Sequence, residues 1–191
     1  MSDTTHRDSV RHKSFRSSKE LVDYCKPIEQ GWFRCQAIAI GAAKLEPEQC
    51  EIACRAAVNA AQSEKDAYRQ IMPLAWPIEA LASIGLRNQA KRLAEDAIKQ
   101  AMSITPSNSK AEALDVMYRH FEQLDLKYRK RIFLMLVEMA EKERGGRIGR
   151  NCAQIAIDLD RLGEREFIDE AISHCQNTKL VGRIHRITDK G

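Results

Sequence analysis

Long hydrophobic runs are missing from this sequence. The longest apolar stretches, near residues 37–43 and 132–137, fall well short of the roughly 20 residues that a membrane-spanning helix needs. The N-terminal residues are polar and basic, whereas a secretory signal peptide carries an apolar segment there. We therefore expect a cytoplasmic protein that does not enter the membrane.

Signals for β-strands are scarce as well. The 191 residues include only nine glycines and few runs of β-branched side chains, which leaves little material for strands. Apolar residues make up 43% and charged residues 30%, as in an ordinary globular domain with a continuous core. The composition therefore predicts an all-α protein.

Metal-binding spacings are also absent. The six cysteines form neither a Cys-x-x-Cys motif nor a Cys/His pattern that suits zinc. A disulfide framework is typical of small secreted domains, not of a chain with this much core. We expect the cysteines to be small core residues, and we expect no metal and no cofactor.

What the sequence does contain is a repeated pattern of apolar residues. Segments that begin at Leu45, Gly85, Leu124 and Gly163 are offset by 40, 39 and 39 residues. When the four segments are aligned, equivalent positions form columns. Four columns lie after the segment starts: Cys50, Ala90, Arg129 and Ile168; Ala53, Leu93, Ile132 and Ala171; Cys54, Ala94, Phe133 and Ile172; and Ala57, Ala97, Leu136 and Cys175. Two columns precede them, namely Ile38, Ile78, Met117 and Ala156; and Gly41, Leu81, His120 and Leu159.

A period of this length indicates stacked helical hairpins, because one helix pair cannot bury its apolar face alone. We predict a right-handed α-solenoid of about four antiparallel helical hairpins with a period of 39–40 residues. Gly85 is expected to end a helix in the left-handed conformation. Pro73 and Pro77 predict either a helix start or a kink in the second hairpin, and the helix start is the simpler interpretation.

The chain divides into three parts in this interpretation. Residues 1–16 are polar and without periodicity, which predicts a disordered basic arm. Residues 17–177 form the helical-repeat domain, which opens with a short helix capped by Ser17 or Ser18. Residues 178–191 lose the pattern and are predicted to be a basic C-terminal tail.

The second hairpin resembles a known repeat. Its Gly85-x4-Ala90-x6-Ala97 spacing is similar to the turn and second helix of a tetratricopeptide repeat. The preceding helix lacks the Trp, Leu-Gly and Tyr signature of that family, and the longer period is nearer to that of HEAT-type repeats. The resemblance, to generic helical-repeat proteins over residues 28–176, implies an α-solenoid that binds partners.

Positive charge is concentrated in three segments. Residues 1–19 carry +3, residues 127–150 carry +5 and residues 178–191 carry +3, although the whole chain carries only +4. The rest of the chain therefore carries about −7. The acidic body suggests that a partner is partly basic, and the basic segment 127–150 suggests an acidic patch on it.

The segment 127–150 also suggests a phosphate-binding surface. Its cations lie near helix starts, which themselves attract anions, and Tyr118 and Tyr128 offer stacking surfaces. The simpler interpretation is a solvated face whose cations pair with glutamates. The candidate anion- or partner-binding residues are Lys127, Arg129, Lys130, Arg131, Arg144, Arg147 and Arg150.

Catalytic signatures are lacking. No Gly-rich phosphate loop, Gly-x-Ser-x-Gly elbow or di-iron motif occurs. An enzyme would require His120 or His174 to be exposed in a cleft beside a carboxylate. Because His120 shares a column with two leucines, we expect it to be a half-buried structural residue, and we predict that the chain is not an enzyme.

The sequence thus predicts a non-catalytic protein- or peptide-binding scaffold with a groove lined by helical repeats. Apolar anchors in the groove would supply affinity, and charge would steer and orient the partner. The alternative is nucleic-acid binding through the phosphate backbone, which requires the basic side chains of residues 127–150 to form one continuous face.

Overall fold

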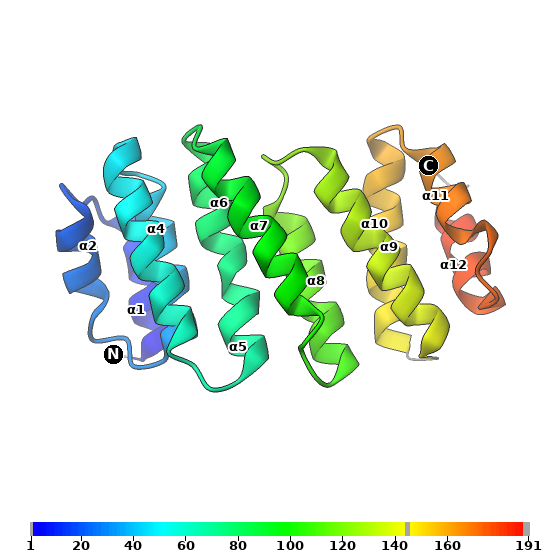
Figure 1. Ribbon diagram of the computed structural model, residues 1–191, viewed down its shortest axis with the longest axis horizontal. Helices are drawn as coiled ribbons and strands as arrows, with labels where there is room; N and C mark the ends of the chain where they lie inside the picture. The colour runs from blue at the N-terminus through cyan, green and yellow to red at the C-terminus, as the bar shows by residue number, and fades with distance from the viewer. Residues whose placement is uncertain (1, 144–145, 189–191) are drawn as a thin grey trace.

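The computed structural model describes residues 2–143 and 146–188, and this part of the chain is helical throughout, without a strand. The helices stand side by side in a row, and the two chain ends lie at opposite ends of the row (Figure 1). The predicted all-α class is therefore confirmed. In chain order the elements are α1 Asp3–Ser9, η1 Val10–His12, α2 Ser18–Cys25, α3 Gly31–Ala42, α4 Pro47–Gln62, α5 Ala67–Ile71, η2 Met72–Leu74, α6 Ala75–Ser83, α7 Arg87–Ala101, α8 Ser107–His120, α9 Leu126–Lys142, α10 Gly146–Arg161, α11 Arg165–Ser173 and α12 Thr178–Thr188.

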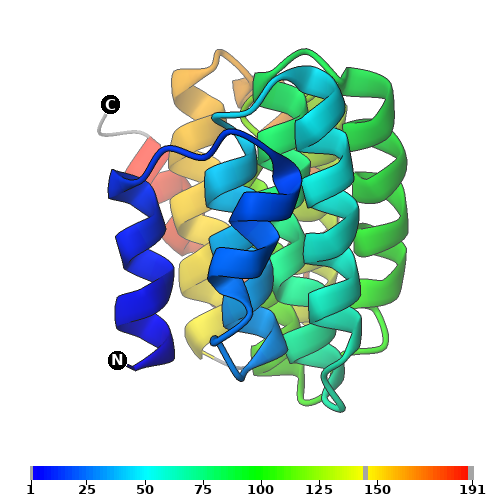
Figure 2. The same cartoon turned by 90° about the vertical axis from the view of Figure 1, so that its left-hand side faces the viewer.

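Successive helices pack as pairs, and the pairs pack on one another. The helices α3 and α4, α6 and α7, α8 and α9, and α10 and α11 are in contact as pairs. The first helices of the pairs also touch in order, from α3 through α6 and α8 to α10. The second helices α4, α7, α9 and α11 form a separate layer in front of them (Figures 1 and 2).

The apolar columns coincide with the core between these layers. Most of their members are buried, and Ile78, Ala94 and Phe133 are fully inaccessible to solvent. Burying a side chain as large as Ile78 or Phe133 stabilises the folded state by about 1.5–3 kcal/mol. The columns therefore mark the faces on which each helix packs. The partly exposed members are Leu93, His120, Arg129, Ala171 and Cys175.

Two glycines close their hairpins in the same way. Gly85 and Gly163 have positive φ angles of 85° and 81°. The N–H of Leu86 donates to the carbonyl of Leu81 at 2.9 Å, and the N–H of Glu164 donates to that of Leu159 at 3.0 Å. These bonds are the Schellman pattern that ends a helix, so the predicted left-handed cap at Gly85 is confirmed.

Alanine at Gly85 is expected to lower the free energy of unfolding by about 1 kcal/mol, because only glycine adopts positive φ without a steric cost. Alanine at Gly163 should cost the same amount, since the two turns are equivalent. No atom lies within 4 Å of a β-carbon built at either position, so no clash contributes. Urea unfolding of both variants checks this, and two clearly different losses would contradict the equivalence.

The region of Pro73 and Pro77 contains the start of a helix, as the simpler prediction has it. The helix α6 begins at Ala75, and the 3-10 turn η2, which contains Pro73, joins it to α5. Proline lacks an N–H and clashes with the preceding turn, so a continuous α-helix is interrupted at this point. The second hairpin therefore opens with α5, η2 and α6 in succession.

The prediction that residues 1–16 form a disordered arm is wrong. Its residues 3–9 form α1, which packs on α3. Val10 is fully buried, and the Arg7 guanidinium donates to Gln36 Oε1 at 2.9 Å while lying over the Phe33 ring. These contacts come from residues 26 and 29 positions away along the chain, so they leave no periodic signal in the arm itself.

The predicted C-terminal tail, residues 178–191, is also helical where it is described. Its helix α12 buries Leu180 and Ile184 against α10, and residues 189–191 lie outside the described part. At the other end of the row, α2 packs on α3 and α4 and begins at Ser18, directly after Ser17, whose hydroxyl accepts from the N–H of Glu20. Of the two predicted caps, Ser17 and Ser18, it is therefore Ser17 that caps the helix.

Within the described ranges, the helices are too short or too polar for any of them to cross a membrane.

Candidate functional site

The predicted basic residues fall into two separate groups. Lys127, Arg129, Lys130 and Arg131 occupy the first turns of α9, whereas Arg147 and Arg150 occupy the first turns of α10. The 17 residues of α9 span about 25 Å, and α10 begins where α9 ends, so the groups lie at opposite ends of this hairpin (Figure 1). Arg144 lies outside the described residues.

The cations at the start of α9 also point to different neighbours. Lys130 Nζ lies 2.5 Å from a Glu164 carboxylate oxygen, and Arg131 Nη1 lies 2.7 Å from one of Glu95. Lys127 lies over the ring of the adjacent Tyr128. These cations therefore bridge to α7 and α11 or cover their own helix, and they do not form one continuous basic face.

The contacts of Arg129 explain why a charged residue occupies a position in an apolar column. Its guanidinium lies over the Tyr118 ring, 4.3 Å from the centroid, in the interface between α8 and α9. A planar guanidinium stacks on aromatic faces, so it packs where the other hairpins carry small or apolar side chains. Burial raises the pKa of Tyr118 to about 12, although the charge of Arg129 opposes this shift. The role of Arg129 is therefore packing between two helices.

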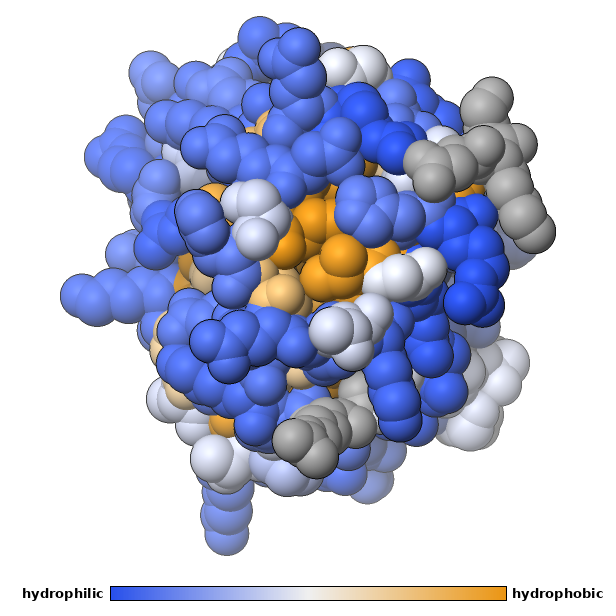
Figure 3. All heavy atoms as spheres, turned by 90° about the vertical axis from the view of Figure 1, so that its right-hand side faces the viewer, coloured by the Kyte–Doolittle hydropathy of each residue, from blue (hydrophilic) through white to orange (hydrophobic). Residues whose placement is uncertain are grey.

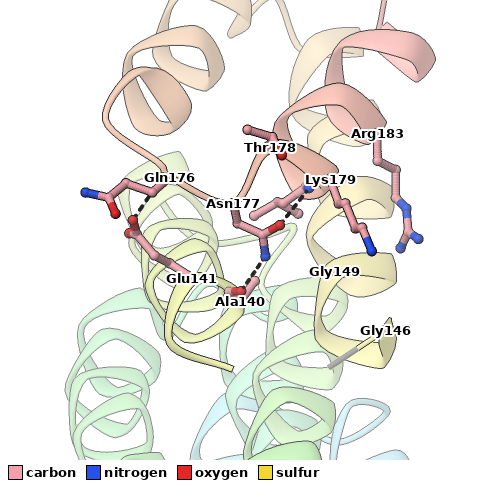
Figure 4. A pocket seen from close by; sticks show the side chains of 10 residues that line it. Ala140, Glu141, Gly146, Gly149, Gln176, Asn177, Thr178, Lys179 and Arg183 are labelled. Carbon is pink, nitrogen blue, oxygen red and sulfur yellow. Dashed lines mark hydrogen bonds between the residues drawn. The ribbon is translucent and has the colours of Figure 1, made fainter. Parts of the chain in front are cut away.

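A pocket lies at the start of α10, and its basic lining residues are Lys179 and Arg183, not Arg147 or Arg150. The pocket has a volume of about 430 Å³ and lies between the C-terminal end of α9, the start of α10 and the start of α12 (Figure 4). Lys179 and Arg183 extend from α12 toward α10 in this view. Arg147 is 3.7 Å from Glu112, and Arg150 has no ion-pair partner among the described residues. Sequence reasoning missed this grouping because it joins a predicted tail to α10.

Hydrogen bonds fix the walls of this pocket. The Asn177 side-chain amide donates to the Ala140 carbonyl at 2.8 Å, and its Oδ1 accepts from the Leu180 N–H at 3.2 Å, which caps α12. The N–H of Gln176 donates to Glu141 at 3.0 Å. Because Glu141 also lines the pocket, the wall carries a negative charge as well as the positive charges of Lys179 and Arg183.

A second groove runs between α4 and α7, the second helices of the first two hairpins. It has a volume of about 440 Å³ and is floored by Cys54, Val58, Leu81 and Leu93. Leu81 belongs to α6 in the layer behind, so the floor is the exposed edge of the core (Figure 1). The remaining lining residues are polar or charged: Glu51, Arg55, Asn59, Gln62, Gln89, Arg92 and Asp96.

The floor of this groove includes one thiol of a cysteine pair on α4. The Sγ atoms of Cys50 and Cys54 are 3.8 Å apart on α4. The hydrogen bond between the two thiols and burial both raise the pKa of Cys54. A thiol that stays protonated is a weak nucleophile, so Cys54 contributes apolar surface to the floor. The rim supplies hydrogen bonds and charges of both signs.

A histidine and a carboxylate are in contact in the layer formed by the first helices of the hairpins, between α8 and α6. His120 Nδ1 is 2.7 Å from Glu79 Oε2, and its ring stacks on Trp76 with centroids 4.3 Å apart. The His120 side chain is 21% exposed, which fits the predicted half-buried residue. Glu79 and Trp76 line a pocket of about 210 Å³, and His120 is not among its lining residues. His174 is exposed after the end of α11.

Across residues 2–143 and 146–188, no group of three or more His, Cys, Asp or Glu side chains is arranged to hold a metal ion. All six cysteines are free, and five of them are buried.

Comparison with known proteins gave no match, whether the chain was set against protein families, curated proteins or solved structures.

Proposed function

We propose that this chain is a non-catalytic scaffold that binds a segment of a protein partner in the groove between α4 and α7. The four hairpins would form a right-handed α-solenoid of the tetratricopeptide or HEAT-like kind. A reducing compartment such as the cytoplasm suits its six free cysteines. The observation that carries the proposal is the apolar floor of the groove, which lies between two helices of charged and polar residues.

The groove favours an amphipathic segment as its occupant. The floor side chains Val58 and Leu93 are partly exposed, and they can accept apolar anchors spaced along one face of a helix or strand. Glu51 and Asp96 offer acceptors for basic residues of the partner, whereas Arg55 and Arg92 offer donors for acidic ones. Apolar anchors would provide most of the affinity, and the charged rim would set the orientation.

Leu93→Asp is expected to reduce capture of the partner by about tenfold or more, because it places a charge on the floor of the groove. The tagged chain and the variant are used to capture proteins from native lysate, and bound proteins are quantified by mass spectrometry. Leu134→Asp is the matched control, since Leu134 is 45% exposed on α9 and lies outside the groove. Circular dichroism verifies that both variants remain folded.

The proposal fails if Leu93→Asp captures the same proteins in the same amounts as the unchanged chain. Nucleic-acid binding is the alternative, with the pocket between α10 and α12 as its best-placed basic surface. Nuclease treatment of the lysate separates the two functions. Partners that survive nuclease support the scaffold, whereas recovery that collapses supports phosphate binding.

A further inference from the structure

The C-terminal end of the row presents an apolar patch. Figure 3 views this end, where α11 and α12 lie, and shows hydrophobic atoms gathered in its centre within a hydrophilic rim. α11, the turn after it and α12 carry the apolar residues Ile172, Cys175 and Val181; Ile172 is buried, and Cys175 and Val181 are partly exposed. α12 packs mainly on α10, and the apolar atoms at this end of the row are open to solvent (Figure 3).

The N-terminal end of the row is different. There α2 packs across both α3 and α4 and buries Leu21 and Cys25 beneath it. The outer side chains of α2 are charged and exposed, among them Lys19, Glu20, Asp23 and Lys26. A stacked helical array needs a polar cover at each end, and within the described residues only the N-terminal end has a complete one.

The two helices that flank the apolar patch carry opposite charges. The exposed ionisable side chains of α11 include Glu166, Glu170 and Asp169, and Asp169 also lies 3.4 Å from Arg165 Nε on the same helix. Those of α12 are basic, and no acidic residue occurs between Thr178 and Thr188. They are Arg186, together with Lys179 and Arg183, which line the pocket beside α10. The patch therefore has an acidic border on one side and a basic border on the other.

We infer that this end face binds the same face of a second copy of the chain. A two-fold axis parallel to the helices would place α11 of each copy against α12 of the other, so that each acidic border meets a basic one and the apolar patches meet in the centre. The other two-fold axis would pair acidic α11 with acidic α11. A head-to-tail arrangement would set the apolar patch against the charged surface of α2, so charge and apolarity both favour the symmetric dimer.

Sedimentation velocity from low to about 100 µM protein is expected to show a monomer–dimer equilibrium that weakens as salt is raised. Asp169→Lys alone and Arg186→Glu alone should each weaken the dimer by about tenfold, because each places like charges together twice across the two-fold axis. The double variant Asp169→Lys/Arg186→Glu restores opposite charges and should dimerise again. Such a rescue excludes simple unfolding as the cause of the losses.

Asp23→Lys is the control, because it makes the same charge change on α2 at the opposite end of the row. It should leave the dimer unchanged, whereas head-to-tail association would respond to it and would continue beyond dimers. A chain that stays monomeric over this range, a dimer that ignores both single variants, or a double variant that remains monomeric would each overturn the inference.

Discussion

Phe133→Ala is expected to lower the free energy of unfolding by about 3–5 kcal/mol, the range for a fully buried aromatic side chain. Phe133 belongs to the third apolar column, is inaccessible to solvent and packs 6.0 Å, centroid to centroid, from Phe167 of α11. Its removal leaves a cavity between the third and fourth hairpins, where the helix backbones relax only partly. Urea unfolding followed by circular dichroism measures the loss.

Leu134→Ala is the matched control for Phe133→Ala. Leu134 is the next residue of the same helix but is 45% exposed, so its loss should change the free energy of unfolding by no more than about 1 kcal/mol. Equal losses at the two positions would contradict the assignment of the third column to the core between hairpins.

Gly31→Ala is expected to cost about 3 kcal/mol, near the upper end for overpacking. A β-carbon at Gly31 would lie 2.2 Å from the carbonyl oxygen of Ala60 and 2.6 Å from Ser63 Oγ. Because the first of these atoms is backbone, the start of α3 would have to move away from the end of α4. The close approach of α3 and α4 at this end of the first hairpin would then be lost.

Gly182→Ala is expected to raise the stability of the protein, whereas Gly31→Ala lowers it. Gly182 lies inside α12, and no atom lies within 4 Å of a β-carbon built there. Alanine has the higher helix propensity, so this variant should gain up to about 1 kcal/mol. Parallel thermal unfolding of the two variants measures both effects, and a Gly31 variant as stable as the unchanged chain would contradict the close packing of α3 on α4.

The core positions could be predicted from the sequence because each helix carries its own packing face. The spacing of Cys50, Ala53, Cys54 and Ala57 defines one side of α4 without reference to any other helix. The turn at Gly85 is similarly local, since positive φ selects glycine. Local rules of this kind identify the buried faces of the helices and the turn at Gly85 without reference to the rest of the fold.

The functional surfaces depend on contacts between helices that are distant in sequence. The basic segment 127–150 is continuous in sequence, but α9 separates its two halves in space. The groove between α4 and α7 exists because these two helices are held apart over α6, a distance that no single helix specifies. For the same reason, the composition of residues 1–16 and 178–191 does not predict that α1 packs on α3 and that α12 packs on α10.

The most direct test of the scaffold proposal is a photo-crosslinking amino acid placed at Val58, on the floor of the groove between α4 and α7. Irradiation in native lysate, with and without nuclease, is followed by mass spectrometry of the adducts, and the same probe at Leu134 serves as the control. The proposal predicts a defined protein adduct at Val58 that survives nuclease and is absent at Leu134. Identical adducts from both positions, or none from Val58, would contradict it.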